Sequence, residues 1–187
     1  MIIICPGFHP PQLTQNFISA IGLSHPSDPK CFVIPTNIAP YNGIDIYHWL
    51  SQQLNPSPPA LSFVGFSAGV VGAMGTALMW QQQGGIVNSL IAVDGWGVPL
   101  VGSFPIYRVS HDPFTHVTSG LLGYGEQNFY CLPEVSHLKL WQSPDTAWGW
   151  WEFKLGCRVR CSAAKMINKV LFPHIESSTS ESQDGYL

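Results

Sequence analysis

Charged residues are scarce in this sequence. Asp, Glu, Lys and Arg make up 10% of its 187 residues, whereas soluble domains usually contain about 25%. The 8 basic residues are outnumbered by 11 acidic ones, so the formal net charge is −3. Nucleic-acid-binding domains usually present a strongly basic face. We therefore expect no nucleic-acid partner.

Cysteines are few and do not follow the spacing of a disulfide framework. There are 5 of them, an odd number in a chain long enough to bury a core without disulfides. Cys157 and Cys161 stand close together, but no second pair with metal-binding spacing lies near them. No basic region precedes the short apolar run at residues 1–5, as a secretory signal would require. We expect a reduced, cytoplasmic protein without a metal site.

Long uncharged runs are also rare, and one of them needs an explanation. Residues 61–80 carry no charge and are long enough on paper to span a bilayer. However, no Lys or Arg lies between Lys30 and Arg108, so the run lacks the basic anchors usual for such a span. It also divides into a strand at 61–66 and a helix at 69–83. We therefore predict no stable membrane insertion.

Short apolar runs alternate with amphipathic segments along most of the chain. The predicted strands are residues 1–5, 31–35, 61–66, 89–93, 106–110 and 128–132. The predicted helices follow Thr14 and cover residues 44–54, 69–83 and 162–171. Such alternation is typical of an α/β fold in which helices cover both faces of a mostly parallel sheet. We predict a three-layer α/β/α sandwich as a single domain over residues 1–175, with a flexible polar tail at 176–187.

Residues 65–69 (GFSAG) match the pattern G-x-S-x-G between a predicted strand and a predicted helix. In this context the serine lies on a sharp, strained turn, and the glycines leave room for neighbouring elements. Ser67 would stand at the carboxyl end of a central strand, where open α/β sheets bind ligands. We therefore predict that Ser67 is a nucleophile. The alternative is a Gly/Ser-rich turn without chemistry.

A nucleophilic serine needs a histidine base and an acid that orients it. His137 follows the last predicted parallel strand, so we predict that it is the base. Asp94 and Asp112 each end a strand at the same edge of the sheet. Asp112 is favoured because a rigid turn with proline follows it and it is closer to His137 in sequence, but Asp94 stays open. His111 and His116 flank Asp112, a pattern too weak to predict a metal site.

The developing oxyanion of an acyl-transfer reaction needs two N–H donors. The sequence predicts the backbone N–H groups of Ala68, directly after the serine, and Phe8, in the loop after the first strand. His9 follows in the same loop and could line the entrance. Trp141 begins an aromatic cluster that either covers the sheet or forms an apolar wall of the site. We take His9 and Trp141 as candidate substrate-lining residues.

These features resemble the α/β-hydrolase superfamily, in particular its small members without a cap domain, such as the retinoblastoma-binding serine hydrolase group. The resemblance covers residues 2–171 and rests on the first strand and loop, residues 65–69, and the order Ser67, Asp112, His137. It implies that these three residues are nucleophile, orienting acid and base, and that no cofactor is needed. The first loop departs from the family, which often has His-Gly or a Gly-rich run where this chain has residues 6–10 (PGFHP).

The sequence therefore predicts a cytoplasmic serine hydrolase. No insertion is long enough for a lid domain, so a small or medium acyl ester or thioester is the expected substrate. Two alternatives stay open. One is a non-catalytic protein-binding domain that retains the serine turn for its fold, and the other is an acyltransferase. An arrangement in which Ser67 and His137 can reach each other would favour catalysis.

Overall fold

Strands and helices alternate along the chain in the computed structural model, which describes residues 1–23, 31–54, 59–154 and 156–173. The strands are β1 (Ile2–Cys5), β2 (Cys31–Val33), β3 (Leu61–Phe66), β4 (Val87–Val93), β5 (Ile106–Ser110), β6 (Gln127–Cys131), β7 (Trp148–Lys154) and β8 (Cys157–Ser162). The helices are α1 (Pro11–Ala20), α2 (Gly43–Gln53), α3 (Ala68–Gln82), α4 (Pro113–Gly120), α5 (His137–Gln142) and α6 (Ala163–Leu171).

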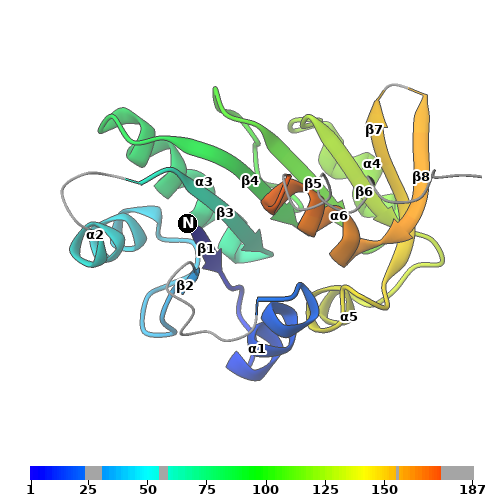
Figure 1. Ribbon diagram of the computed structural model, residues 1–187, viewed down its shortest axis with the longest axis horizontal. Helices are drawn as coiled ribbons and strands as arrows, with labels where there is room; N and C mark the ends of the chain where they lie inside the picture. The colour runs from blue at the N-terminus through cyan, green and yellow to red at the C-terminus, as the bar shows by residue number, and fades with distance from the viewer. Residues whose placement is uncertain (24–30, 55–58, 155, 174–187) are drawn as a thin grey trace, which may run out of the picture.

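The strands form one eight-stranded sheet in the order β2-β1-β3-β4-β5-β6-β7-β8 (Figure 1). All neighbours from β2 to β6 run parallel, and β7 and β8 continue the sheet as antiparallel strands. This confirms the predicted α/β class and the mostly parallel sheet. The predicted flexible tail at 176–187 lies outside the described residues.

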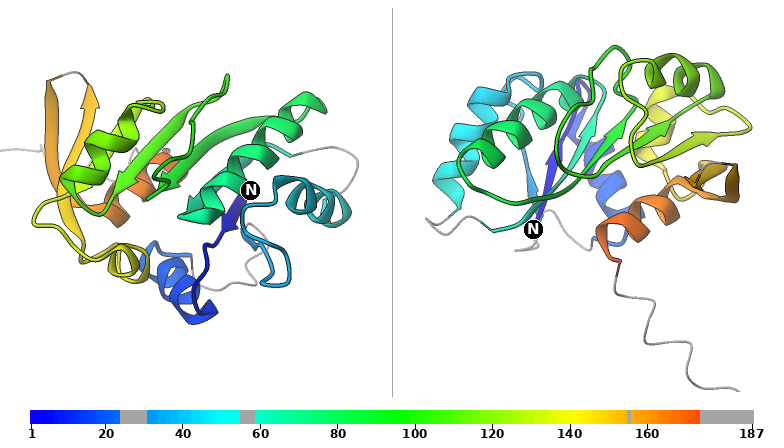
Figure 2. Two further views of the ribbon diagram at one scale, coloured as in Figure 1. Left: turned by 180° about the vertical axis from the view of Figure 1, so that it is seen from behind. Right: turned by 90° about the horizontal axis from the view of Figure 1, so that it is seen from above.

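Helices lie on both faces of the sheet, as the views in Figure 2 show. The apolar side chains of α1, α5 and α6 pack on one face, and those of α2 and α3 pack on the other. Strand β1 supplies both cores, because Ile2 and Ile4 face the first set of helices while Ile3 and Cys5 face the second. A strand buried on both faces must be apolar throughout, which explains the apolar start of the chain. The arrangement is compatible with the three predicted layers.

Residues 61–80 divide at Ser67 into β3 and α3, as the sequence predicts. Helix α3 is apolar all round because the sheet covers one side and α2 packs on another. A Cβ atom on Gly72 would lie 2.1 Å from the carbonyl oxygen of Pro40, so the absence of a side chain allows the segment before α2 to approach. No helix among the described residues is both long and apolar enough to cross a membrane.

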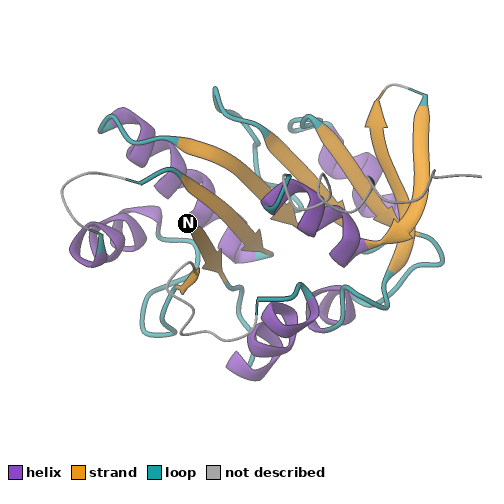
Figure 3. Ribbon diagram, in the orientation of Figure 1, coloured by secondary structure: helices purple, strands orange, loops and turns teal. Residues whose placement is uncertain are grey.

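The elements that differ most from the prediction lie in the second half of the chain. Figure 3 shows the helices and strands that the structure has there. Trp148, Trp150 and Trp151 were predicted only as part of the aromatic cluster that begins at Trp141. They lie in β7, which pairs with β8 in a hairpin. Helices α4 and α5 were not predicted either. Strands β7 and β8 expose much of their surface and show no clean alternation, and α4 and α5 have 8 and 6 residues. Patterns this short and irregular give little periodic signal.

Candidate functional site

Ser67 lies at a sharp turn between β3 and α3. Its backbone has a positive φ of 54° with ψ −122°, and its N–H donates to the carbonyl of Val93 at 2.9 Å. Such a conformation costs about 1–3 kcal/mol in a residue other than glycine and is found mostly at functional sites. The strand, strained serine and helix predicted from the motif are therefore confirmed.

The two glycines of the motif allow close packing around this turn. A Cβ atom on Gly65 would lie 2.8 Å from the Cα of Val70, and one on Gly69 would lie 2.1 Å from the carbonyl oxygen of Cys5. Real Cβ atoms do not approach other atoms this closely. Gly69 therefore lets the start of α3 pack directly against the end of β1.

The loop after β1 lies against Ser67. A Cβ atom on Gly7 would lie 2.9 Å from the carbonyl oxygen of Phe66 and 3.1 Å from the Cβ of Ser67. Phe8 therefore follows a residue that is packed on the serine turn. Ala68 is the first residue of α3, and backbone N–H groups in the first turn of a helix have no partner within it. The predicted oxyanion donors, Phe8 and Ala68, thus come from two segments that meet at Ser67.

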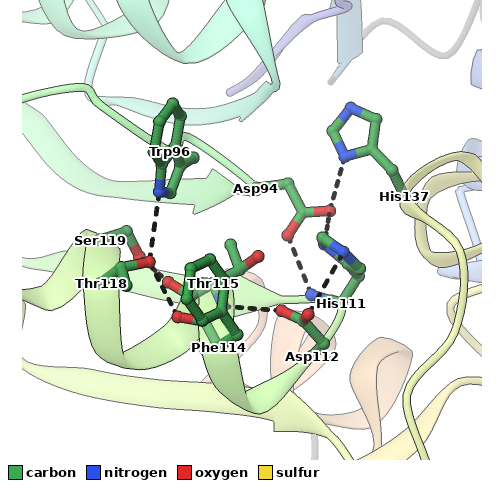
Figure 4. Close-up of polar contacts among 9 residues, drawn as sticks. All are labelled: Asp94, Trp96, His111, Asp112, Phe114, Thr115, Thr118, Ser119 and His137. Atoms are coloured by element: carbon green, nitrogen blue, oxygen red, sulfur yellow. Dashed lines mark hydrogen bonds and ion pairs between the residues drawn. The ribbon is translucent and has the colours of Figure 1, made fainter.

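Asp94 holds His137 and also a second histidine, His111 (Figure 4). The Nδ1 atom of His137 donates to Oδ2 of Asp94 at 2.8 Å. The Nδ1 atom of His111 donates to the same oxygen at 2.9 Å, and the backbone N–H of His111 donates to Oδ1 at 2.9 Å. Both carboxylate oxygens are therefore occupied, and Asp94 orients both imidazole rings.

The predicted pairing of Asp112 with His137 is wrong in this structure. Asp112 caps helix α4, where its Oδ1 accepts the N–H of Thr115 at 2.7 Å. The closest ion-pair contact of its carboxylate is with Nε2 of His111, at 3.8 Å. Asp112 therefore stabilises the start of α4, and the acid beside His137 is Asp94.

Strand register explains why the nearer aspartate in sequence is not the partner. Phe66 of β3 pairs with Val93 of β4, so Ser67 and Asp94 leave neighbouring strands at the same level. Asp112 comes two residues after β5, which lies one strand further from β3. Asp94 also adopts a positive φ of 50°, which aspartate tolerates better than most residues.

His137 is the first residue of α5, with Ser136 as the helix cap. The prediction placed it in a loop after the last parallel strand, so its location near the sheet edge is confirmed but its local structure differs. Its ring stacks on Phe66, the residue before the serine, with ring centroids 4.5 Å apart. The side chain is 41% exposed, whereas that of Asp94 is 1% exposed.

The buried carboxylate of Asp94 is held in its ionised form. Burial raises its pKa, but the hydrogen bonds from His111 and His137 outweigh burial, and the pKa is lowered overall. The pKa of His111 is raised, chiefly by its hydrogen bond to Asp94. Asp94 can therefore stabilise positive charge on a neighbouring imidazole near neutral pH.

Ser67, Asp94, His111 and His137 open into one pocket of about 370 Å³. Its remaining walls are Ala68, Val71, Trp96, Val98, Phe114 and Thr115. Trp96 is held by a hydrogen bond from its indole N–H to the hydroxyl of Thr118, at 3.2 Å. The sequence reasoning missed Trp96, Val98 and Phe114. Their position just after Asp94 or Asp112 was the available signal, because strand-end loops share one edge of a parallel sheet.

Trp141 does not line this pocket, which corrects its prediction as a substrate-lining residue. It is 0% exposed, its ring stacks on Phe17 at 3.7 Å, and it also stacks on Phe66 at 4.8 Å. Its indole N–H donates to the buried hydroxyl of Thr14 at 3.3 Å. Trp141 is thus a core residue that fixes α5 beneath His137.

His9 lies beside a second pocket instead of the one that contains Ser67. This apolar pocket of about 270 Å³ is formed by the loop after β1, helix α1 and the segment between β2 and α2. The ring of His9 lies 5.5 Å from that of Phe66, and His9 lines this second pocket but not the one that contains Ser67. The predicted place of His9 at the entrance to the serine site is therefore not the place that the structure gives it.

The two histidines that flank Asp112 are separated. His111 joins Asp94 and His137, whereas His116 on α4 lies 3.4 Å from the carboxylate of Glu152. His116 also stacks on Tyr130, and its Nδ1 has no hydrogen-bond partner among the described residues. His111 and His116 therefore do not meet at Asp112, where the sequence pattern was too weak to predict a metal site.

His116 should make the stability of the fold depend on pH. Burial, aided by Arg108 and opposed by Glu152, lowers its pKa. The unfolded chain therefore binds this proton at higher pH than the folded chain does. Acid therefore favours the unfolded chain, and the free energy of unfolding falls as the pH drops through about 6.5 toward the pKa of His116 in the folded protein.

Urea unfolding at about pH 7.5 and about pH 5.5 measures this effect. His116→Gln should lose less stability on acidification than the unsubstituted protein. The raised pKa of His111 acts in the opposite direction, since its stabilisation is lost as pH rises, and it is common to both proteins. An equal or larger acid loss in His116→Gln would contradict the assignment.

Comparison with known proteins gives no relative from which function could be inferred: no protein-family model matches the chain, and no curated protein matches it. A functional assignment therefore depends on the geometry of the site.

Proposed function

We propose that this protein is a serine hydrolase in which Ser67 is the nucleophile, His137 the base and Asp94 the orienting acid. The observation that carries the proposal is the Asp94–His137 hydrogen bond of 2.8 Å in the pocket that also contains the strained Ser67. A buried carboxylate, an imidazole and a serine on a strand-to-helix turn are the groups needed for nucleophilic acyl transfer.

Each group has one role in the reaction. Asp94 accepts the hydrogen on Nδ1 of His137, which leaves Nε2 of that ring to take the proton from Ser67 as its Oγ attacks an acyl carbonyl. Asp94 then stabilises the imidazolium, which donates its proton to the leaving group. Water releases the acyl group from Ser67 in a second, similar step. All these groups come from the chain itself, so the mechanism needs no cofactor.

Backbone N–H groups of Ala68 and Phe8 would stabilise the oxyanion. The close approach of Gly7 to Ser67 supports this assignment, because it brings the loop after β1 beside the proposed nucleophilic residue. Preorganised donors of this kind contribute about 2.7–4 kcal/mol each to transition-state stabilisation.

The pocket supports a small or medium acyl ester or thioester as substrate. Its apolar walls, Trp96, Val98 and Phe114, would contact the acyl or leaving group, and its volume of about 370 Å³ suits a small molecule. The same arrangement supports a place in the α/β-hydrolase superfamily, with the acid after β4. We propose a cytoplasmic location for such an enzyme, because its cysteines do not follow the spacing of a disulfide framework.

A non-catalytic binding domain is the second candidate, and one observation favours it. Among the described residues, no hydrogen bond joins Ser67 Oγ to His137. Catalytic hydrogen bonds are often long in the absence of substrate, and His137 is exposed enough to move. The Ser67–His137 contact is therefore the step that an experiment must test.

Labelling with a fluorophosphonate probe tests whether Ser67 is activated. The unsubstituted protein should be labelled on Ser67, as identified by mass spectrometry of the labelled peptide. Ser67→Ala should not be labelled, and His137→Ala should react roughly 10³-fold more slowly or worse, because the base is lost. The matched controls Ser103→Ala and His48→Gln change exposed residues of the same types outside the pocket.

The proposal would be contradicted if folded protein is not labelled, or if it is labelled at another residue. Either result would favour the binding-domain candidate. If Ser67 is labelled, release of product from ester and thioester substrates, with water or with an added alcohol or amine as acceptor, separates hydrolysis from acyl transfer.

A further inference from the structure

The proposed mechanism has no role for His111. A nucleophilic serine needs one histidine and one acid, yet Asp94 binds two histidines through the same oxygen. One nitrogen from each ring and one oxygen of Asp94 lie within 4.8 Å of one another. Figure 4 shows Asp94 between the two rings. Three such donors, from the residues directly after β4 and β5 and from the start of α5, meet at one point of the pocket.

The donor atoms are those that a divalent transition metal prefers. Imidazole nitrogen and carboxylate oxygen bind Zn²⁺ at about 2.0–2.2 Å, and open zinc sites commonly have three protein ligands and one exchangeable position. Ligand atoms of a tetrahedral site are then about 3.4 Å apart. The N···O distances of 2.8 and 2.9 Å would therefore have to widen by about half an ångström.

The side chains allow that small change while the acid stays fixed. His111 is 25% exposed and His137 is 41% exposed, so both rings have room to turn. Asp94 is held in place, because its Oδ1 accepts the backbone N–H of His111 at 2.9 Å. Hydrogen bonds of this kind orient metal ligands. The pocket also provides space for a water molecule or a substrate atom at the fourth position.

We propose that Asp94, His111 and His137 bind one Zn²⁺ ion, which enters through the pocket that contains Ser67. The ion would take the positions of the hydrogens that the two Nδ1 atoms now share with Asp94, and each neutral ring would then carry its hydrogen on Nε2. The binding of zinc depends only on these three ligands and not on the proposed reaction. Its consequence rests on the proposed function: an ion on His137 and Asp94 separates the base from its acid, so zinc would hold the hydrolase inactive.

Zinc binding is measured by competition with a chromophoric chelator. The unsubstituted protein and Ser67→Ala should each bind one ion, and zinc should raise the melting temperature of both. His111→Gln should bind roughly 10- to 100-fold more weakly, which is the loss that even an outer partner of a metal ligand causes. His48→Gln and Cys157→Ser are the matched controls, since both residues are exposed and lie outside the cluster.

A second substitution guards against a folding defect in His111→Gln. Asp94→Asn keeps the size of the side chain and should lose zinc binding as well, and circular dichroism of each variant shows whether it is folded. Failure of the unsubstituted protein to bind zinc would overturn the proposal. Equal binding by folded His111→Gln would also overturn it, because the ion would then lie elsewhere.

The effect of zinc on Ser67 is measured separately. Zinc should slow fluorophosphonate labelling of the unsubstituted protein, and a chelator should restore it, whereas zinc should slow labelling of His111→Gln proportionally less. Binding without any effect on labelling would overturn the inhibitory role. If Ser67 is not labelled even without zinc, the proposed function fails, and the binding measurement on Ser67→Ala still decides whether the metal site exists.

Discussion

Replacement of Asp94 by Asn should lower the rate of fluorophosphonate labelling at Ser67 by about 10⁴-fold, the loss seen when the acid of a serine triad becomes an amide. Asn has one acceptor oxygen and a neutral side chain. Its one oxygen cannot replace both Oδ1 of Asp94, which accepts the backbone N–H of His111, and Oδ2, which accepts from Nδ1 of His137. The amide also cannot stabilise the imidazolium. His137 would then adopt the wrong tautomer or orientation.

Asp112→Asn provides the matched control on the neighbouring strand end. Asp112 accepts the N–H of Thr115 at the start of α4, and Asn caps helices about as well as Asp does. We therefore expect labelling within roughly threefold of the unsubstituted protein. Asp112→Ala should cost about 1 kcal/mol of stability through loss of the cap, with labelling retained.

Second-order rate constants for labelling, measured on variants whose circular dichroism matches that of the unsubstituted protein, decide between the two acids. A large loss in Asp112→Asn with near-normal reactivity in Asp94→Asn would reverse the assignment. Equal losses in both would mean that the Asp94–His137 hydrogen bond does not explain the reactivity of Ser67.

Gly69→Ala should prevent stable folding, the second large effect that we expect. A single added methyl group would lie 2.1 Å from the carbonyl oxygen of Cys5 and 2.5 Å from that of Pro6. Both obstacles are backbone atoms of the strand end and the loop on which Ser67 packs, so neither can turn away. We expect a loss above about 4 kcal/mol, which is a large fraction of the stability of a typical domain.

Gly75→Ala is the matched control in the same helix. Its added methyl group would have ordinary contact with Gly43, at 3.4 Å. Alanine is favoured over glycine within a helix by about 0.5–1 kcal/mol, so this variant should be as stable as the unsubstituted protein or slightly more stable. Soluble yield and urea unfolding measure both variants. A folded Gly69→Ala of normal stability would contradict the close packing of α3 on the end of β1.

The sequence was informative wherever its signal was local. The apolar runs at β1, β3 and β4 predict buried strands because a strand covered on both faces must be apolar throughout. Residues 65–69 predict the strained turn because few residue types fit so tight a strand-to-helix connection. His137 was also identifiable, since the order of elements places it after β6, the last parallel strand.

Long-range contacts could not be read in the same way. The pairing of β7 with β8 and the burial of Trp141 among Phe17 and Phe66 depend on segments that are distant in the chain. The same tryptophan could have lined the pocket or filled the core, because either environment suits an aromatic ring.

The choice between Asp94 and Asp112 as the acid beside His137 shows most clearly what the local sequence could not predict. Asp94 and Asp112 both follow strands, and their local sequences favoured Asp112 because of the turn after it. The α/β class and the proposed nucleophile thus followed from the order of residues, since buried strands and tight turns restrict residue types locally. The acid, the second histidine on Asp94 and the pocket walls depend on strand register and helix capping, which place side chains only when the chain is folded.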